Sequence, residues 1–343
     1  MQVQQWAVVG AGAAGIASVG HLLDQGIDPQ QIIWIDPSFS GGDIAQKWLE
    51  VPSNTKVGLF HQFFKHCQAF EIAQAPNFAL FQMPVSDTCQ LKMIIPPLKW
   101  VIKTLANKVQ TIQTNCLAID KTTSEWQLTL EKNTRIYAHK VILAIGAEPK
   151  QAIYAQPTTI KLTQALNPTL LAAQVTANDI IAVFGSSHSA ILIIKNLVEL
   201  GIKKIINFYR QPLRYAQYYP DGILYDNTGL KGIAATWAKQ YIEEYPLENL
   251  QRVLSTKDTI QTLLPQADKA IYSIGFNRRS ILLNQQVINA YDMKTGRIDQ
   301  HLYGVGIAFP ERIIDRTGNE EFNVGLWKFA QFLEKNISNW ISE

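Results

Sequence analysis

Three glycines near the N-terminus have the spacing of a loop that binds the phosphates of a dinucleotide. Gly10, Gly12 and Gly15 form the pattern G-x-G-x-x-G in GAGAAG, between an apolar stretch and a run of small residues typical of a helix. The first glycine permits a tight turn, the second lets the backbone approach a pyrophosphate, and the third lets helix and strand pack closely. The free N–H groups at the start of the helix, at Ala13 and Ala14, then bind phosphate.

An acidic residue follows this turn where dinucleotide-binding folds place their ribose contact. The second apolar stretch, IIWID, ends in Asp36, about 20 residues beyond the glycines. A carboxylate there accepts a hydrogen bond from a ribose hydroxyl, and it suits a ribose that carries no phosphate. The first turn therefore predicts a site for a dinucleotide with an unmodified adenosine ribose.

A second strand–turn–helix segment lies in the middle of the chain. Its turn, GSSHSA, has Gly185 in the first glycine position, Ser187 in the second and Ala190 in the third. Serine in the middle position is compatible with a phosphate that lies slightly farther away or that meets the hydroxyl. Ser186 and His188 are then neighbours of a phosphate or ribose. An ordinary α/β crossover is the alternative.

Two arginines follow the next strand of this second unit. Arg210 comes directly after the apolar run KKIINFY, and Arg214 is close behind. An arginine where the first unit has an acid suits a 2′-phosphate, because the guanidinium is a planar fork for phosphate. We therefore predict FAD at the first turn and NADPH, or NADH in its place, at the second. Simple surface solvation is the alternative for both arginines.

The composition limits the other classes of function. The 343 residues are 47% hydrophobic and 17% charged, and the net charge of +3 comes from scattered basic residues, which gives no case for nucleic acid. Cys67, Cys89 and Cys116 form no C-x-x-C pair, which argues against a disulfide scaffold, a metal site and a dithiol redox centre. No apolar run reaches membrane-spanning length. We expect a cytoplasmic protein with a small-molecule substrate; the sequence carries no signal of its oligomeric state.

The two turns indicate an internal duplication of an α/β fold. We predict two Rossmann-like domains in three layers, each with a parallel sheet, one domain inserted in the other, and a small antiparallel excursion in the first. Apolar strands end at Gly146 and Gly275, where we place the crossings between the domains. The predicted FAD-binding domain comprises residues 1–150 and 272–343, and the predicted NAD(P)H-binding domain comprises residues 151–271.

The chain resembles flavoproteins with two dinucleotide-binding domains over nearly its whole length. The motifs that carry this resemblance are GAGAAG, Asp36, LAIGAEP at Gly146, GSSHSA, and YSIGFNRR at Gly275. Within that superfamily, GGDIAQKW followed by VPSNTKV is similar to flavin-containing monooxygenases and their N-hydroxylating and Baeyer–Villiger relatives.

The resemblance to the monooxygenases implies roles for individual residues. It implies that Gly42, Gln46 and Trp48 lie near the flavin. It also implies that Asn54 and Thr55 lie beside the reactive edge, where an amide can hydrogen-bond the flavin in a dry pocket. A turn residue after a proline is the alternative for Asn54.

Other features depart from the family patterns. The F-x-G-x-x-x-H-x-x-x-Y/W fingerprint of the monooxygenases is absent before the second turn, where TTIKLTQALNPTLL stands. YGVGIAFPE replaces the Gly-Asp pair of disulfide reductases, and no C-x-x-C supports a thioredoxin reductase activity.

Cys116 begins a strand of the type whose main chain meets the FAD adenine, so its backbone matters more than its sulfur.

The sequence thus predicts an FAD- and NADPH-dependent oxidoreductase that resembles flavin monooxygenases, in which reduced flavin activates O2. One alternative is a flavoprotein reductase that passes electrons to an acceptor. Another is a non-enzymatic flavin-binding sensor or scaffold with a degenerate second site, as Ser187 indicates. The poorly periodic, Tyr-rich stretch 215–245 is expected to lie over the nicotinamide cleft.

Overall fold

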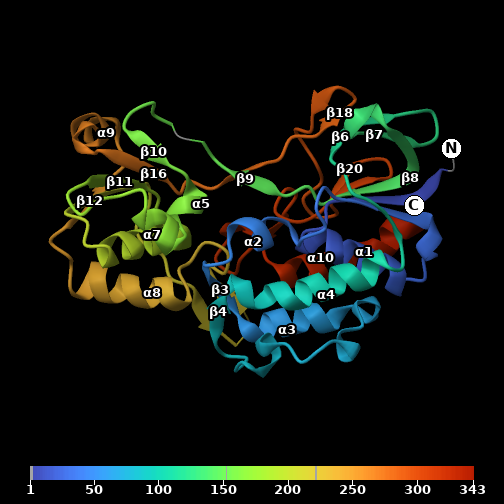
Figure 1. Cartoon of the computed structure of the whole chain (residues 1–343), viewed down its shortest axis with the longest axis horizontal. Coiled ribbons are helices and arrows are strands. Elements are labelled where there is room, and N and C mark those ends of the chain that lie inside the picture. The colour runs from blue at the N-terminus through green and yellow to red at the C-terminus, as the bar shows by residue number, and fades with distance from the viewer. Residues whose placement is uncertain (1–2, 152, 221) are drawn as a thin grey trace.

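The computed structural model describes residues 3–151, 153–220 and 222–343. Two layered units, each built around parallel strands, lie side by side and are joined by extended connections (Figure 1). Residues 1, 2 and 152, within the predicted domains, and Asp221, within the Tyr-rich stretch, lie outside the described residues. The two sheets confirm the predicted α/β fold.

The first sheet has a parallel core that continues into antiparallel strands. Its order is β19-β18-β6-β7-β8-β1-β2-β5, with β21 beside β8 and β20 beside β21. The parallel core consists of β1 (Gln4–Val9), β2 (Ile32–Ile35), β5 (Gln110–Ile112), β8 (Arg135–Leu143) and β21 (Leu302–Gly304). The other strands are β6 (Cys116–Lys121), β7 (Trp126–Leu130), β18 (Leu282–Leu283), β19 (Gln286–Val287) and β20 (Arg297–Asp299). Because β8 pairs antiparallel with β7 and parallel with β1, it joins the predicted excursion to the core.

Helices cover one face of this sheet. Side chains of β1 alternate between two buried clusters, one under the helices and one under the antiparallel strands, as a strand buried on both faces requires. The covering helices, seen below the sheet in Figure 1, are α1 (Ala13–Asp24), α3 (Val57–His66), α4 (Ile95–Ala106) and α10 (Leu326–Ser342). Of these, α1 packs against both α4 and α10.

The second sheet is entirely parallel, in the order β10-β16-β11-β12-β15. Its strands are β10 (Thr158–Ile160), β16 (Lys269–Tyr272), β11 (Ile180–Phe184), β12 (Lys204–Tyr209) and β15 (Leu250–Leu254). The helices α7 (His188–Glu199) and α8 (Gly232–Ala238) cover one face, and α9 (Lys257–Leu263) covers the other.

Two short strands form the link between the sheets. The chain leaves the first sheet through β9 (Ala147–Pro149) and returns through β17 (Phe276–Arg278), and these two strands pair with each other. Each follows a glycine in the left-handed region, with φ of 74° at Gly146 and 96° at Gly275. The second sheet is therefore an insertion between β8 and β18 (Figure 1).

The Tyr-rich stretch contains more regular structure than its sequence predicts. It forms the hairpin β13 (Gln217–Tyr219) and β14 (Gly222–Leu224), then α8 and a π-helical turn, Lys239–Glu244. Each element is too short to establish a period that the sequence could reveal. Lys56 lies 5.0 Å from the ring of Tyr218, so the hairpin contacts the strand β3 (Pro52–Lys56) of the other unit.

Candidate functional site

The first glycine turn has the tight geometry that its spacing predicts. Gly10 adopts φ of 108°, and its N–H donates to the carbonyl of Ile35 at 2.7 Å. A Cβ on Gly10 would lie 2.3 Å from the carbonyl oxygen of Ala144, and a Cβ on Gly15 would lie 1.9 Å from that of Gly10. Both positions therefore exclude any side chain.

The second glycine lies at the start of α1, where the start of α2 (Gly42–Lys47) is its nearest neighbour. The nearest atom to a Cβ on Gly12 would be the Cα of Gly42, 3.9 Å away, and no side chain caps this helix end. The N–H groups of Ala13 and Ala14 are thus among the helix donors that lack an intrahelical acceptor. Gly42 begins α2, so the structure brings this predicted flavin-side residue to the phosphate turn.

Asp36 is buried beside the turn and holds it closed. Its Oδ2 accepts the N–H of Ala11 at 2.7 Å, and its Oδ1 accepts the N–H groups of Ser38 and Phe39 at 2.8 and 2.7 Å. A carboxylate has about four lone-pair sites, which leaves Oδ2 able to accept one further donor. The sequence predicted the ribose contact but not this support of the loop.

Gln46 and Trp48, two other residues expected near the flavin, contact different parts of the structure. Gln46 is exposed, and its amide donates to the hydroxyls of Ser38 and Ser40 at 3.0 and 2.7 Å. Trp48 packs edge-to-face on Phe276, with ring centroids 6.1 Å apart, and against the helical core of the second unit. Gln46 thus braces the loop after Asp36, whereas Trp48 lies between the two units.

Asn54 and Thr55 lie in β3, which pairs with β4 (Thr88–Gln90), so Asn54 is not a turn residue. Both are half-buried. Ser53 is buried and accepts the N–H of Thr55 at 2.8 Å, which fixes the local backbone. The Thr55 hydroxyl donates to Oδ1 of Asn54 at 3.4 Å.

The second glycine turn repeats the backbone geometry of the first. Gly185 adopts φ of 125°, its N–H donates to the carbonyl of Phe208 at 2.9 Å, and a Cβ on it would lie 2.3 Å from the Ser273 carbonyl oxygen. Asn207, fully buried in β12, donates to the carbonyls of Gly185 and Val183 at 2.8 and 3.0 Å. Sequence reasoning missed Asn207, and its only signal was a polar residue inside an apolar strand.

The two serines of this turn have different surroundings. Ser186 donates to the carbonyl of Gln211 at 3.1 Å, which ties the turn to the segment after β12. Ser187 is the exposed N-cap residue of α7, yet its hydroxyl makes no capping hydrogen bond. Because serine usually caps through that hydroxyl, the start of α7 keeps its N–H donors for another acceptor.

His188 connects the second turn to β3. Its Nε2 lies 3.1 Å from the carbonyl oxygen of Pro52, and burial lowers the pKa of the imidazole. A neutral ring that donates from Nε2 carries its lone pair on Nδ1. Within the described residues that buried Nδ1 has no hydrogen-bond partner.

The predicted arginines are exposed beyond the end of β12. Arg214 stacks over the ring of Tyr225 at 5.3 Å. The strand registers make Tyr209, not Arg210, the counterpart of Asp36. Arg252 of β15 lies over the Tyr209 ring at 4.8 Å, which places a further guanidinium near this strand end.

The remaining predicted residues lie at or directly before the start of a strand. Burial raises the pKa of Cys116 to about 12, so its thiol is unreactive and only its backbone is of interest. Gly146 lies under the Arg279 guanidinium, whose Nη1 would be 2.9 Å from an added Cβ, whereas Gly275 faces open space. The sequence did not indicate the loop after β21. A Cβ added to Gly306 in this loop would lie 2.7 Å from the Cβ of Ala14, so the loop packs against the start of α1.

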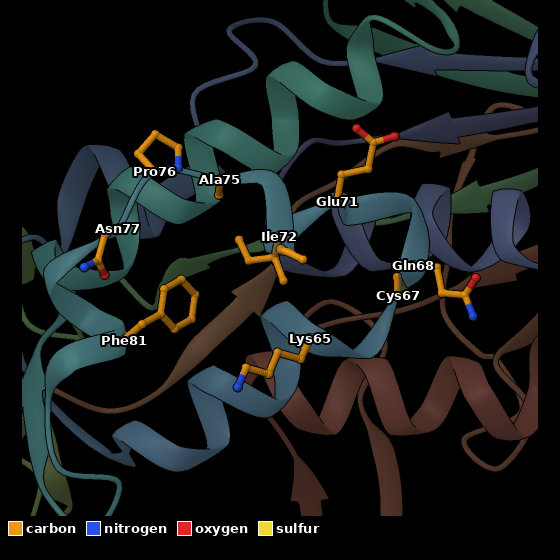
Figure 2. A pocket seen from close by; sticks show the side chains of 10 residues that line it. Lys65, Cys67, Gln68, Glu71, Ile72, Ala75, Pro76, Asn77 and Phe81 are labelled. Carbon is orange, nitrogen blue, oxygen red and sulfur yellow. The ribbon is translucent and has the colours of Figure 1, made fainter.

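A hollow of about 570 Å³ lies elsewhere, where α3 ends and the following loop begins. Figure 2 shows Ile72, Phe81 and Lys65 around this space, and none of its lining residues belongs to either turn. In the part of the chain that the structure describes, no helix has the length and apolarity of a membrane span. Nor do three or more His, Cys, Asp or Glu residues there gather as a metal site.

Comparison with known proteins relates this geometry to flavoproteins. No family model matches the chain. The chain is 29% identical over 384 aligned positions to "Monooxygenase AgnR1" of Paecilomyces divaricatus, covering 98% of this chain and 97% of that protein.

Solved structures with little sequence identity share the fold. A flavin-containing monooxygenase from Stenotrophomonas maltophilia is 12% identical, covers 100% of this chain and 99% of its own, and gives a TM-score of 0.67. OTEMO in an FAD-bound form (12%, 99% and 98%) and the bacillithiol disulfide reductase of Staphylococcus aureus (12%, 98% and 99%) both give 0.61. The chain therefore has the two-unit fold of FAD- and NAD(P)-binding flavoproteins, as predicted, and resembles a monooxygenase over its full length.

Proposed function

We propose that the chain is an FAD-dependent, NADPH-using oxidoreductase of the flavin monooxygenase kind, acting on a small molecule. The observation that carries the proposal is the pair of glycine turns with equal geometry and different strand ends: an acid, Asp36, in the first, and a tyrosine, Tyr209, followed directly by Arg210, in the second. The full-length likeness to a monooxygenase supports the same function. When bound, FAD would accept hydride from NADPH and react with O2.

The first turn fits FAD. Gly12 has no side chain that would block a pyrophosphate, the uncapped start of α1 supplies N–H donors, and Oδ2 of Asp36 can accept a ribose hydroxyl. We assign the adenine end to the backbone near Cys116, and the edges of the site to Gly42, Gln46 and Gly146.

The second turn fits NADPH. The uncapped α7 and the hydroxyls of Ser186 and Ser187 suit a pyrophosphate, and the unpaired Nδ1 of His188 suits a ribose or amide donor. Arg210 and Arg214 suit the 2′-phosphate, because a guanidinium binds phosphate through two parallel hydrogen bonds.

The reactive edge of the flavin is assigned to Asn54 and Thr55. The hydrogen bond from His188 to Pro52 supports this assignment, because it joins the second turn to β3. Trp48 would then help to exclude water between the units. We place the domain boundaries near Gly146 and Gly275, close to the paired strands β9 and β17, with a FAD domain of residues 1–150 and 272–343 and a NADPH domain of residues 151–271. The second boundary thus falls at Tyr272, the last residue of β16.

One experiment tests the proposal. The purified protein is examined for flavin absorbance, reduced with NADPH without oxygen, and then mixed with oxygen. We expect bound FAD, rapid reduction, and an oxygen-dependent transient distinct from oxidised and reduced flavin. Absence of flavin would refute the proposal, and flavin that NADPH cannot reduce would favour a sensor or scaffold. Fast reduction without the transient, but with electron transfer to ferricyanide, would favour a reductase.

A further inference from the structure

Arg279 joins three segments at the edge of the first turn. Its Nη2 lies 2.6 Å from Oδ2 of Asp43 in α2, its Nε lies 3.3 Å from Glu148 in β9, and its Nη1 donates to the carbonyl of Ile145 at 3.3 Å. Arg279 itself follows β17. One guanidinium therefore connects the returning chain to α2 and to the end of β8.

The residue paired with Arg279, Asp43, lies next to a close contact between α2 and the glycine turn. A Cβ on Gly42 would be 3.0 Å from the Cα of Gly12, so the start of α2 lies against the second glycine. Asp43 is the next residue of that helix. The ion pair with Arg279 therefore fixes α2 across the turn that faces the proposed pyrophosphate.

The charges around Asp43 suit a neighbouring anion. A carboxylate close to a pyrophosphate would repel it, but Lys47 at 3.1 Å and Arg279 at 2.6 Å both pair with Asp43. Without Arg279, the carboxylate has a single cationic partner and α2 loses its tie to the junction at Gly146.

We propose that Arg279 and Asp43 form a clasp that retains FAD, an inference that rests on the proposed function. Arg279 and Asp43 act as positioning residues: they hold α2 over the pyrophosphate and slow release of the flavin. The two side chains are 33% and 19% exposed, so the pair contributes little to the stability of the flavin-free protein.

The test measures how fast the holoprotein loses FAD in repeated, timed desalting steps, followed by flavin absorbance. Asp43→Asn and Arg279→Gln should each release FAD roughly tenfold faster, the effect of losing a charge-assisted hydrogen bond of about 1.4 kcal/mol. The double variant should release it no faster than either single variant, because both remove the same interaction. Arg279→Lys, which keeps the charge, should restore part of the retention.

Glu148→Gln is the matched control, since it removes a partner of Arg279 that is 58% exposed and does not belong to α2. We expect its release rate to stay within about twofold of the wild-type rate. Single variants that retain FAD like the wild type would overturn the clasp while leaving the proposed function intact. Variants whose flavin-free form unfolds at a markedly lower temperature would also overturn it. A wild-type protein that binds no FAD would overturn both proposals.

Discussion

The two glycine turns have the same backbone and different polar partners. In each, the first glycine donates to the strand that follows, and an added Cβ would lie 2.3 Å from the carbonyl oxygen of the residue directly after a third strand. Trp34 and Asn207, equivalent by register, each donate to the carbonyl of that first glycine at 2.8 Å. Close packing therefore sets the shape of the turn, and very different side chains can support it.

The partners that close the two turns differ in charge. The carboxylate of Asp36 accepts the N–H of Ala11 in the first turn. In the second, Tyr209 takes the position of Asp36, and the hydroxyl of Ser186 makes the equivalent tie to Gln211. The second turn thus lacks a fixed negative charge at the strand end, which suits a phosphorylated ribose, whereas the first suits an unmodified one.

The largest effect is expected from alanine at the first glycine of each turn. Gly10→Ala should lower the free energy of unfolding by roughly 3 kcal/mol or more and yield protein without flavin, because both the positive φ and the contact with Ala144 oppose a side chain. Gly185→Ala should keep bound flavin but lose reduction by NADPH. Flavin absorbance and anaerobic reduction measure the two outcomes.

Gly26→Ala provides the control for this pair. Gly26 has φ of 82°, but nothing lies within 4 Å of an added Cβ, so the cost should be only about 1 kcal/mol. If Gly185→Ala removed the flavin as completely as Gly10→Ala does, the two turns would not bind separate cofactors.

Acid should destabilise the folded protein through a histidine in α1, and α7 has no histidine at the equivalent position. Burial, followed by the nearby His66, lowers the pKa of His21 to about 4, whereas Asn196 holds the same position in α7. Between pH 6.5 and 4 the unfolded chain binds the proton that the folded chain excludes. Stability is therefore lost as the pH falls through this window, by roughly 3 kcal/mol.

His21→Asn copies the second helix and should remove that part of the pH dependence. Urea unfolding at several pH values, compared between wild type and variant, measures the difference. Parallel stability curves for the two proteins between pH 6.5 and 4 would show that His21 does not cause the acid sensitivity.

The side-chain hydrogen bonds of Asn207 at the second turn should contribute more to the free energy of unfolding than the hydrogen bond of Trp34 at the first. Asn207→Ala leaves the buried carbonyls of Val183 and Gly185, and Nε of Arg252, without that partner, so it should cost about 2 kcal/mol. Trp34→Phe removes a single hydrogen bond and keeps most of the ring volume, so it should cost about 1 kcal/mol. Unfolding of the flavin-free proteins measures both, and equal costs would contradict this ranking.

The smallest effect concerns the exposed strand end. Arg210→Ala should raise the dissociation constant for NADPH roughly tenfold and leave that for NADH within about twofold, because only NADPH carries a 2′-phosphate. Arg312→Ala, which removes an exposed arginine paired with Glu320, is the control and should change neither constant. An equal loss for both cofactors would refute the role of Arg210.

Local spacing made much of the geometry of the two turns predictable. The glycines at 10, 12 and 15, Asp36 and Gly185 could be identified because a tight turn and a strand end are short-range features of the chain. The alternation of apolar strands with amphipathic helices likewise predicted two sheets with parallel strands. In such sheets the helices that connect the strands cover the faces of the sheet, so the strands are buried on both faces and apolar throughout. The pairing of β13 with β14 was missed because these strands are too short to show a period.

The sequence by itself determined where the two turns lie and which strand end carries the acid. Only the tertiary structure decided what touches them: Arg279 meets Asp43 across 236 positions, and His188 meets Pro52 across 136. Such contacts depend on how the two sheets pack and on the path of β9 and β17 between them. No local pattern encodes them: the sequence placed His188 in the second turn without indicating Pro52 as its partner, and it indicated no role for Arg279 or Asp43.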